Sequence, residues 1–257
     1  MTKDGGLRIA TGGGAMLTDP QSVCELQKLA HAEGSAIFDP AFWASRGQLA
    51  AVAAGRGAAW FVGVAPGHWV LRHYRRGGLI ARVSRDRYVW SGEDRVRAFA
   101  EWRLLAELAG RGLPVPKPIA ARYQRGGLLY RCDLITQRIE DARPLSELLS
   151  LTALPERGWR AVGAVLGRLH AAGADHADLN AHNILVNGAG AVSVIDFDRG
   201  RLRVPGASPP HAGRLLGWRT ANLARLRRSL QKISSDWPQD RFGPVAWEWL
   251  LAGYASG

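Results

Sequence analysis

The sequence predicts an α+β protein with two lobes: a small lobe of antiparallel strands with one helix, and a larger, mainly helical lobe. Two observations favour this class. Strand-like apolar runs separated by turns surround one amphipathic helix in the first half, and helices with apolar stripes recur in the second half. A chain of 257 residues is long enough for one large domain or for a two-lobed one, with ample core in either case. We place an N-terminal extension of uncertain structure at 1–39, the small lobe at 40–136 and the larger lobe at 137–257.

Two strands joined by a hairpin are predicted early in the small lobe, at 55–62 and 69–74. Gly55 and Gly57 would let the backbone N–H groups close over phosphates, although Trp60 stands where a glycine-rich phosphate loop has its third glycine. Arg72 lies on the second strand, where its planar guanidinium can bind a phosphate through two N–H groups. The alternative is an ordinary solvated arginine on a strand.

A helix is predicted over 91–110, where Ser91 and Asp94 resemble a capping pair. Its apolar stripe consists of Val96, Phe99, Trp102, Leu105 and Leu108. Glu101 lies at the edge of this stripe, so its carboxylate can point inward and pair with Arg72. The alternative is an exposed pair with Arg97, which would contribute little stability. We expect the inward pair.

Further elements follow in order along the chain. Residues 128–139 have strand character, and 136–140 would connect the lobes. Amphipathic helices are predicted at 159–172 and 218–233. His170 and His176 are interpreted as structural, because a histidine satisfied within the core is the commoner case.

The stretch 176–198 predicts a β-hairpin with polar side chains at its open end. Its strands are 184–186 and 192–195, and Asn187-Gly188 opens the turn between them. Paired strands bring their open ends together, so Asn183 and Asp196 should lie near each other. Asp178 precedes Asn183 on the loop that leads in.

These three side chains suit phosphoryl transfer. One carboxylate, Asp178, can accept the proton of an attacking hydroxyl, while the amide oxygen of Asn183 and the carboxylate of Asp196 are hard ligands for Mg²⁺. The alternative is a hairpin with polar residues at its solvated end. Because the spacing, the hairpin and both apolar strands agree, we favour the phosphoryl-transfer interpretation.

Composition limits the remaining possibilities. Cys24 and Cys132 are the only cysteines, which argues against a disulfide framework or a structural zinc site. No secretory leader and no apolar run long enough to span a bilayer are visible, so we expect no signal peptide and no transmembrane segment.

The formal net charge of +12 indicates an anionic partner or a generally arginine-rich composition. No nucleic-acid-binding motif is recognisable. Arg75 and Arg76 form a basic turn that can meet an anionic acceptor or face water. The helix at 218–233 has a basic face that can bind anionic lipid headgroups or be simply solvated; its cations are Arg219, Arg225, Arg227, Arg228 and Lys232.

The pattern H-x-D-x-x-x-x-N followed by D-F-x resembles the catalytic and metal-binding loops of the protein-kinase-like fold. Across about 55–232 the chain resembles a narrower family, the bacterial 3-deoxy-D-manno-octulosonic acid (Kdo) kinases of lipopolysaccharide core assembly. The resemblance rests on seven ordered blocks: G-R-G-A-A-W-F-V, V-L-R-H-Y-R-R-G-G-L, A-E-W-R-L-L, G-L-P-V-P-K-P-I-A-A-R, H-A-D-L-N-A-H-N-I-L-V, I-D-F-D-R-G and W-R-T-A-N-L-A-R-L-R-R-S-L.

The resemblance implies a two-lobed kinase-like fold and ATP-dependent phosphorylation of the 4-hydroxyl of Kdo attached to a lipid A precursor. It implies a small nucleotide-binding lobe that includes Gly55, Gly57, Arg72 and Glu101. In the larger, catalytic lobe it implies Asp178 as the catalytic carboxylate, with Asn183 and Asp196 holding Mg²⁺ against the nucleotide.

The resemblance also bears on the acceptor and on location. Asp198 replaces the glycine of D-F-G, and Asn180 stands two residues after Asp178 where protein kinases have lysine. With Arg75 and Arg76, these are candidate acceptor contacts. Because no activation segment with an A-P-E end is recognisable, we expect no protein substrate. A peripheral enzyme at the cytoplasmic face of an anionic inner membrane is implied.

Two alternatives remain open from the residues alone. One is a kinase of another small sugar or an antibiotic, against which the Kdo-type blocks argue. The other is a non-catalytic basic module that binds a membrane or nucleic acid. Retention of Asp178, Asn183 and Asp196 together argues against this second alternative.

Overall fold

The computed structural model describes residues 5–20, 35–52, 59–64, 67–75, 86–203, 217–235 and 241–257. Contacts divide the chain into two compact units, 1–107 with 116–138, and 108–115 with 139–257. Both units mix helices with antiparallel strands. The predicted phosphate-loop residues Gly55 and Gly57, and also Arg76, lie outside the described residues.

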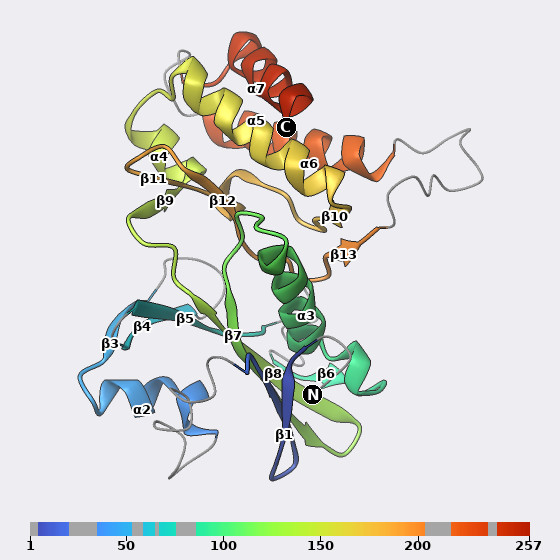
Figure 1. The fold of residues 1–257 in the computed structure, drawn as a ribbon. Coiled ribbons are helices and arrows are strands. Elements are labelled where there is room, and N and C mark those ends of the chain that lie inside the picture. The colour runs from blue at the N-terminus through green and yellow to red at the C-terminus, as the bar shows by residue number, and fades with distance from the viewer. Residues whose placement is uncertain are drawn as a thin grey trace. The chain divides into compact units, whose positions relative to one another are not determined.

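The first unit is built around an eight-stranded antiparallel sheet (Figure 1). The strand order is β1-β2-β7-β8-β5-β4-β3, and β6 pairs with β8 beside this path. The strands are β1 (Leu7–Thr11), β2 (Gly14–Thr18), β3 (Leu49–Val52), β4 (Ala59–Val64), β5 (Gly67–His73), β6 (Tyr88–Val89), β7 (Pro118–Gly126) and β8 (Leu129–Gln137). The predicted hairpin is confirmed as β4–β5.

Alternation along β5 and β8 gives the sheet two different faces. Leu71 pairs with Ile135 and both are fully buried in the core cluster formed with the 3-10 helix η1 (Ala36–Phe38) and with α2 (Pro40–Ala44). Arg72 pairs with Leu134 and belongs to the opposite face, because neighbouring residues of a strand point to opposite sides. The long helix α3 (Arg97–Gly110) supplies Glu101 to Arg72 on that face.

Three boundaries differ from the sequence-based expectations. The predicted N-terminal extension contributes β1 and β2 to the sheet, so it is structured at 7–18. Helix α3 begins at Arg97 and not at 91, because Gly92 has φ 107° and Val96 is extended with its side chain buried, leaving only a 3-10 turn at 93–95. Strand β8 continues through Gln137, so the predicted connector at 136–140 begins later.

The second unit is mainly helical. Its helices are α4 (Leu145–Leu151), α5 (Glu156–Ala171), α6 (Trp218–Ser234) and α7 (Pro244–Ser256). Its short strands are β9 (Ala142–Pro144), β10 (Ala174–Asp175), β11 (Ile184–Asn187), β12 (Val192–Val194) and β13 (Arg201–Leu202). The predicted helices at 159–172 and 218–233 are confirmed as α5 and α6, whereas α7 was not predicted.

Helices α5 and α7 lie side by side in close backbone contact (Figure 1). A Cβ atom on Gly163 would lie 1.9 Å from the backbone oxygen of Leu250, and one on Gly253 would lie 2.1 Å from that of Arg160. Only glycine permits this approach. The sequence signal was present, because glycines recur four residues apart, at 163 and 167 within α5 and at 253 and 257 within and directly after α7.

We expect Gly163→Ala to lower the free energy of unfolding by about 3 kcal/mol, because the added methyl group forces α5 and α7 apart. Thermal unfolding followed by circular dichroism should show a midpoint lower by about 6–12 °C. Gly110→Ala is the matched control, since it also adds a methyl group to a helical glycine but into open space. Equal midpoints for the two variants would contradict the close packing.

Candidate active site

The loop at 176–183 is tied to the rest of the second unit at both ends. Strand β10 leads into it and pairs with β13, which follows the Asp198 segment. A short 3-10 helix at 181–183 ends the loop, and Asn180 caps it by accepting a hydrogen bond from the backbone N–H of His182 at 2.9 Å. The chain therefore enters and leaves this region along one antiparallel pair.

His176 fixes the position of Asp178 from within the core. Its side chain is buried, and burial lowers its pKa below the usual range. The neutral ring then donates from Nε2 to the backbone oxygen of Ile195 at 2.9 Å and accepts at Nδ1 from the N–H of Asp178 at 3.2 Å. One imidazole thus bridges the backbone just before Asp196 to the backbone of Asp178, consistent with the structural role expected for this histidine.

The carboxylate of Asp178 is exposed and is flanked by two amides. Asn180 Nδ2 donates to Asp178 Oδ2 at 3.2 Å and to the Asp178 backbone oxygen at 3.0 Å. Asn183 Nδ2 donates to the same backbone oxygen at 2.9 Å. Because this bond uses the amide nitrogen of Asn183, its Oδ1 remains the atom that can bind a cation.

The predicted hairpin is confirmed as β11–β12, with Ile184 opposite Val194. At its open end the backbone N–H of Ile195 donates to the oxygen of Asn183 at 2.9 Å, so Asn183 and the residue before Asp196 are directly paired. Asp196 has φ 63°, a left-handed conformation that aspartate adopts more readily than most residues. Asp198 is partly buried two residues further on.

Helix α6 supports this loop through polar residues that the sequence analysis did not single out. Asn222 is buried; its Oδ1 accepts from the N–H of His176 at 3.0 Å and its Nδ2 donates to Asp175 at 3.1 Å. Ser229 Oγ accepts from the N–H of Ala181 at 3.3 Å. Both residues belong to the W-R-T-A-N-L-A-R-L-R-R-S-L block, which supported the family resemblance but in which only the cations were singled out as functional residues.

In the first unit, Arg72 and Glu101 form the predicted inward ion pair. Glu101 is buried and accepts from Arg72 Nη2 and from the hydroxyl of Tyr74. Arg72 Nη2 also contacts the Tyr74 hydroxyl at 2.9 Å, and its guanidinium lies 4.7 Å from the centre of the Tyr74 ring. Burial raises the pKa of Tyr74 well above its usual range, so the phenol remains a donor. Tyr74 was missed because a tyrosine at the end of a strand carries no distinctive pattern.

A row of charged groups occupies the opposite face of the same strands. The buried carboxylate of Asp133 accepts from Arg122 Nη2 at 2.7 Å and from His73 Nδ1 at 2.6 Å. His73 Nε2 lies 3.4 Å from Asp86, which also pairs with Arg131. The hydrogen bond to Asp133 is the main reason that the pKa of His73 is raised above 6.5.

This raised pKa predicts a pH-dependent stability. The charged imidazole of His73 stabilises the fold fully below the unfolded-state pKa of 6.5, and the contribution is lost as pH rises through the folded-state pKa. We therefore expect His73→Gln to destabilise the protein more at acid than at alkaline pH. Urea unfolding of the unmodified protein and of His73→Gln, from acid to alkaline pH, measures the difference between their free energies of unfolding. A difference that grows with rising pH would contradict the assignment.

The remaining predicted residues are placed individually. Arg75 is exposed at the end of β5, and the cations of α6 are exposed except for the partly buried Arg225. Asp178, Asn180, Asn183 and Asp196 are gathered in the second unit, whereas Arg72 and Glu101 belong to the first.

Among the described residues, no group of three or more histidine, cysteine, aspartate or glutamate side chains is arranged to hold a metal ion. The oxygen atoms at the open end of the hairpin fit a metal site in which the protein supplies only two ligands. One amide oxygen and one carboxylate, from Asn183 and Asp196, match Mg²⁺ that takes its other ligands from phosphates and water. None of the helices described is long and apolar enough to cross a membrane.

The antiparallel sheet and the helices are consistent with a kinase-like fold, and residues 40–254 match the lipopolysaccharide kinase (Kdo/WaaP) family. The chain belongs to that family. It is 48% identical over 228 residues to the 3-deoxy-D-manno-octulosonic acid kinase of Xanthomonas axonopodis pv. citri, an alignment that covers 88% of this chain and 84% of that protein. A protein of the same name from Stenotrophomonas maltophilia is 46% identical, covering 78% of this chain and 76% of the relative.

Proposed function

We propose that this protein transfers the γ-phosphoryl group of ATP to the 4-hydroxyl of a Kdo residue attached to a lipid A precursor, in lipopolysaccharide core biosynthesis. The observation that carries the proposal is the 48% identity to a 3-deoxy-D-manno-octulosonic acid kinase across 88% of this chain. The constellation of Asp178, Asn180 and Asn183 supports it, since these residues supply the groups that such a transfer requires.

In the proposed reaction, the oxygen of the sugar hydroxyl forms a bond to the γ-phosphorus of ATP while Asp178 accepts the hydroxyl proton. The bond between the γ-phosphorus and the oxygen that leaves with ADP breaks. The amide of Asn180 holds the carboxylate of Asp178 toward the acceptor, and His176 keeps the backbone in place. Asn183 and Asp196 would hold Mg²⁺, which when bound neutralises charge on the phosphates.

The first unit would bind the nucleotide, in a two-lobed arrangement of the protein-kinase type. Arg72 takes the place of the phosphate-binding lysine, and Glu101 with Tyr74 holds its guanidinium in one orientation. The geometry suits arginine, because a planar fork can bond Glu101 and Tyr74 on one side and keep further N–H groups for phosphate oxygens. Gly55 and Gly57 remain proposed phosphate contacts.

The acceptor carries a carboxylate and lipid phosphates, so a basic protein surface would attract it. Arg75, Arg76 and the exposed cations of α6 are proposed to meet these anions and to hold the enzyme peripherally at the cytoplasmic face of the inner membrane. Asn180 and Asp198 are proposed acceptor contacts at the site itself. Neither nucleic acid nor a protein is proposed as a substrate.

Mass spectrometry of a Kdo-bearing lipid A precursor after incubation with the enzyme and ATP tests the function. We expect the mass gain of one phosphate, and fragmentation should place it on the sugar. Parallel incubations with free Kdo and with an aminoglycoside test the alternative acceptors. Phosphorylation of the aminoglycoside alone, or no transfer at all, would refute the proposal. If calorimetry then also showed no metal-dependent binding of ATP, the protein would be a non-catalytic module.

A further inference from the structure

The chain leaves the candidate active site through a tight turn at 197–200, which we call the exit turn. The backbone N–H of Gly200 donates to the oxygen of Phe197 at 2.7 Å and closes it. Arg199 occupies the third position of this turn with φ 59°. Glycine or asparagine is normally found at that position when φ is positive, because other side chains crowd their own backbone. An arginine is therefore held here in a conformation that glycine would adopt without cost.

Positive φ values outside glycine are rare in the described residues and gather beside this site. Among those residues, only Asp141, Asp196 and Arg199 have them. Aspartate enters this conformation more readily than most residues, whereas arginine has no such tendency. Non-glycine residues in sparsely populated conformations cluster at active sites and ligand-binding positions. The arginine at 199 is therefore better explained by what its side chain binds than by the shape of the turn.

Buried contacts hold the exit turn beside the loop that carries Asp178. The Phe197 side chain is buried, and its ring centre lies 4.7 Å from that of His176. His176 in turn accepts a hydrogen bond from the N–H of Asp178 at 3.2 Å. Arg199 and Asp178 each lie two residues beyond one of these rings, and the β10–β13 pair joins the same two segments. The backbone of Arg199 is therefore fixed near the proposed catalytic carboxylate.

The side chain of Arg199 is not engaged by the protein itself. Arg199 is exposed and, within the part of the chain that the structure describes, its guanidinium has no hydrogen-bond or ion-pair partner. Arg203, four residues further on, is by contrast paired with Asp175 at 2.8 Å. The N–H donors of Arg199 are thus available to a ligand.

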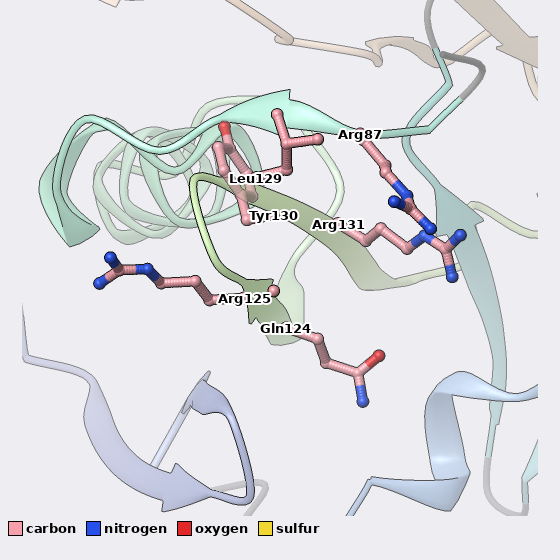
Figure 2. A pocket seen from close by; sticks show the side chains of 7 residues that line it. Arg87, Gln124, Arg125, Leu129, Tyr130 and Arg131 are labelled. Carbon is pink, nitrogen blue, oxygen red and sulfur yellow. The ribbon is translucent and has the colours of Figure 1, made fainter.

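A pocket of about 230 Å³ in the first unit is also lined by arginines (Figure 2). Arg131 Nε there lies 2.8 Å from Asp86, and Arg125 Nε donates to a backbone oxygen at 2.8 Å, so both are engaged within the protein. Arg199 instead belongs to the same compact unit as Asp178. It is consequently the better candidate for contacting a molecule on which Asp178 acts.

An unpaired arginine at this place suits a carboxylate on the acceptor. The proposed acceptor is a sugar acid, in which a single ring carbon separates the carbon that bears the carboxylate from the carbon that bears the 4-hydroxyl. A sugar whose hydroxyl reaches Asp178 therefore brings its carboxylate close as well. A guanidinium can bind such a carboxylate through two parallel N–H···O bonds, which also fix the orientation of the group.

We propose that Arg199 binds the carboxylate of the acceptor sugar, and so both selects a sugar acid over neutral sugars and turns its hydroxyl toward Asp178. This inference rests on the proposed function, because it takes Kdo as the acceptor. The contact makes Arg199 a substrate-binding residue with no part in holding ATP. Since lipid phosphates are a second source of negative charge on the acceptor, the test changes the sugar carboxylate alone.

Steady-state transfer from ATP is measured with the Kdo-bearing lipid A precursor and with the methyl ester of its Kdo carboxylate, for the unmodified protein and for Arg199→Gln. We expect the unmodified protein to use the ester with a kcat/KM about thirty-fold lower than the acid, because the charge-assisted hydrogen bonds are lost. Arg199→Gln should lose about as much on the acid and should then treat acid and ester alike. If Arg199→Gln kept the preference of the unmodified protein for the acid, the proposal would be overturned.

Two further variants separate binding from structure. Arg157→Gln, which removes an exposed arginine of the same unit, should leave both kcat/KM values unchanged. Arg199→Gly should lose the preference for the acid, but its thermal unfolding midpoint should equal that of the unmodified protein or exceed it, because glycine accepts φ 59° without strain. A lowered midpoint together with equal losses on acid and ester would make Arg199 structural. The KM for ATP should not change in any of these variants.

The same measurements distinguish a failure of this inference from a failure of the proposed function. Transfer to the acid by the unmodified protein tests the function, whereas the ratio of kcat/KM for acid and ester tests Arg199. Transfer with an unchanged ratio in Arg199→Gln refutes the inference alone. No transfer by any of the proteins refutes the function, and the inference with it.

Discussion

Asp178→Ala is expected to lower kcat by about 10²–10⁴-fold, because the sugar hydroxyl then loses the group that we propose as the acceptor of its proton during attack. The fold should survive, since the Asp178 side chain is exposed and the loop is held through its backbone by His176 and Asn183. Steady-state transfer of labelled phosphate from ATP to the lipid-linked sugar measures the effect.

The control for this variant is Asp94→Ala, which removes a carboxylate that is 93% exposed and makes only a surface pair with Arg103. It should leave kcat unchanged. Calorimetry should show that Asp178→Ala still binds ATP, because Asn183 and Asp196, the proposed ligands of Mg²⁺, remain. Near-normal transfer by purified Asp178→Ala protein would exclude this residue as the proton acceptor.

The hairpin that carries this site was predictable because its signals are local. Alternating β-branched residues and Asn187-Gly188 specify two strands and their turn within about a dozen residues. Pairing then forces Asn183 and the start of the D-F-D segment together, as the bond from Ile195 N to Asn183 O shows. The partnership of Arg72 with Glu101 was also predictable, because the helix that carries Glu101 follows the strand hairpin that carries Arg72 in the order found in kinases.

The parts that escaped prediction depend on contacts between residues distant in sequence. Asn222 reads as one polar residue in a basic helix, yet it bonds both Asp175 and the backbone of His176 from 46 or more positions away. The charged row through Asp133 joins residues of three strands. In the sequence each of these residues looks like an ordinary polar position of a strand in which polar and apolar residues alternate. Helix α7 lacked a clear apolar stripe, and its close contact with α5 is specified by glycines, which carry no hydrophobic signal.

Glu101→Gln is expected to lower kcat/KM for ATP by about 10²-fold, because a displacement of Arg72 of about 1 Å misplaces the phosphates it would bind. The substitution keeps the shape of the side chain but removes the charge that holds the guanidinium, while Tyr74 still offers its hydroxyl. Glu101 is a positioning residue in this account. The loss should therefore appear largely in KM for ATP, with a smaller change in KM for the sugar acceptor.

Glu147→Gln is the matched control, because Glu147 also pairs with an arginine, Arg143, but both side chains are more than half exposed, at 52% and 59%. Surface pairs of this kind contribute little, so its kinetics should be unchanged. Arg72→Lys should weaken ATP binding even though the charge is kept, because an ammonium cannot hold Glu101, Tyr74 and a phosphate through one planar fork. If Glu101→Gln and Glu147→Gln had the same KM for ATP, the buried pair would be structural, and Arg72 would have no part in binding the nucleotide.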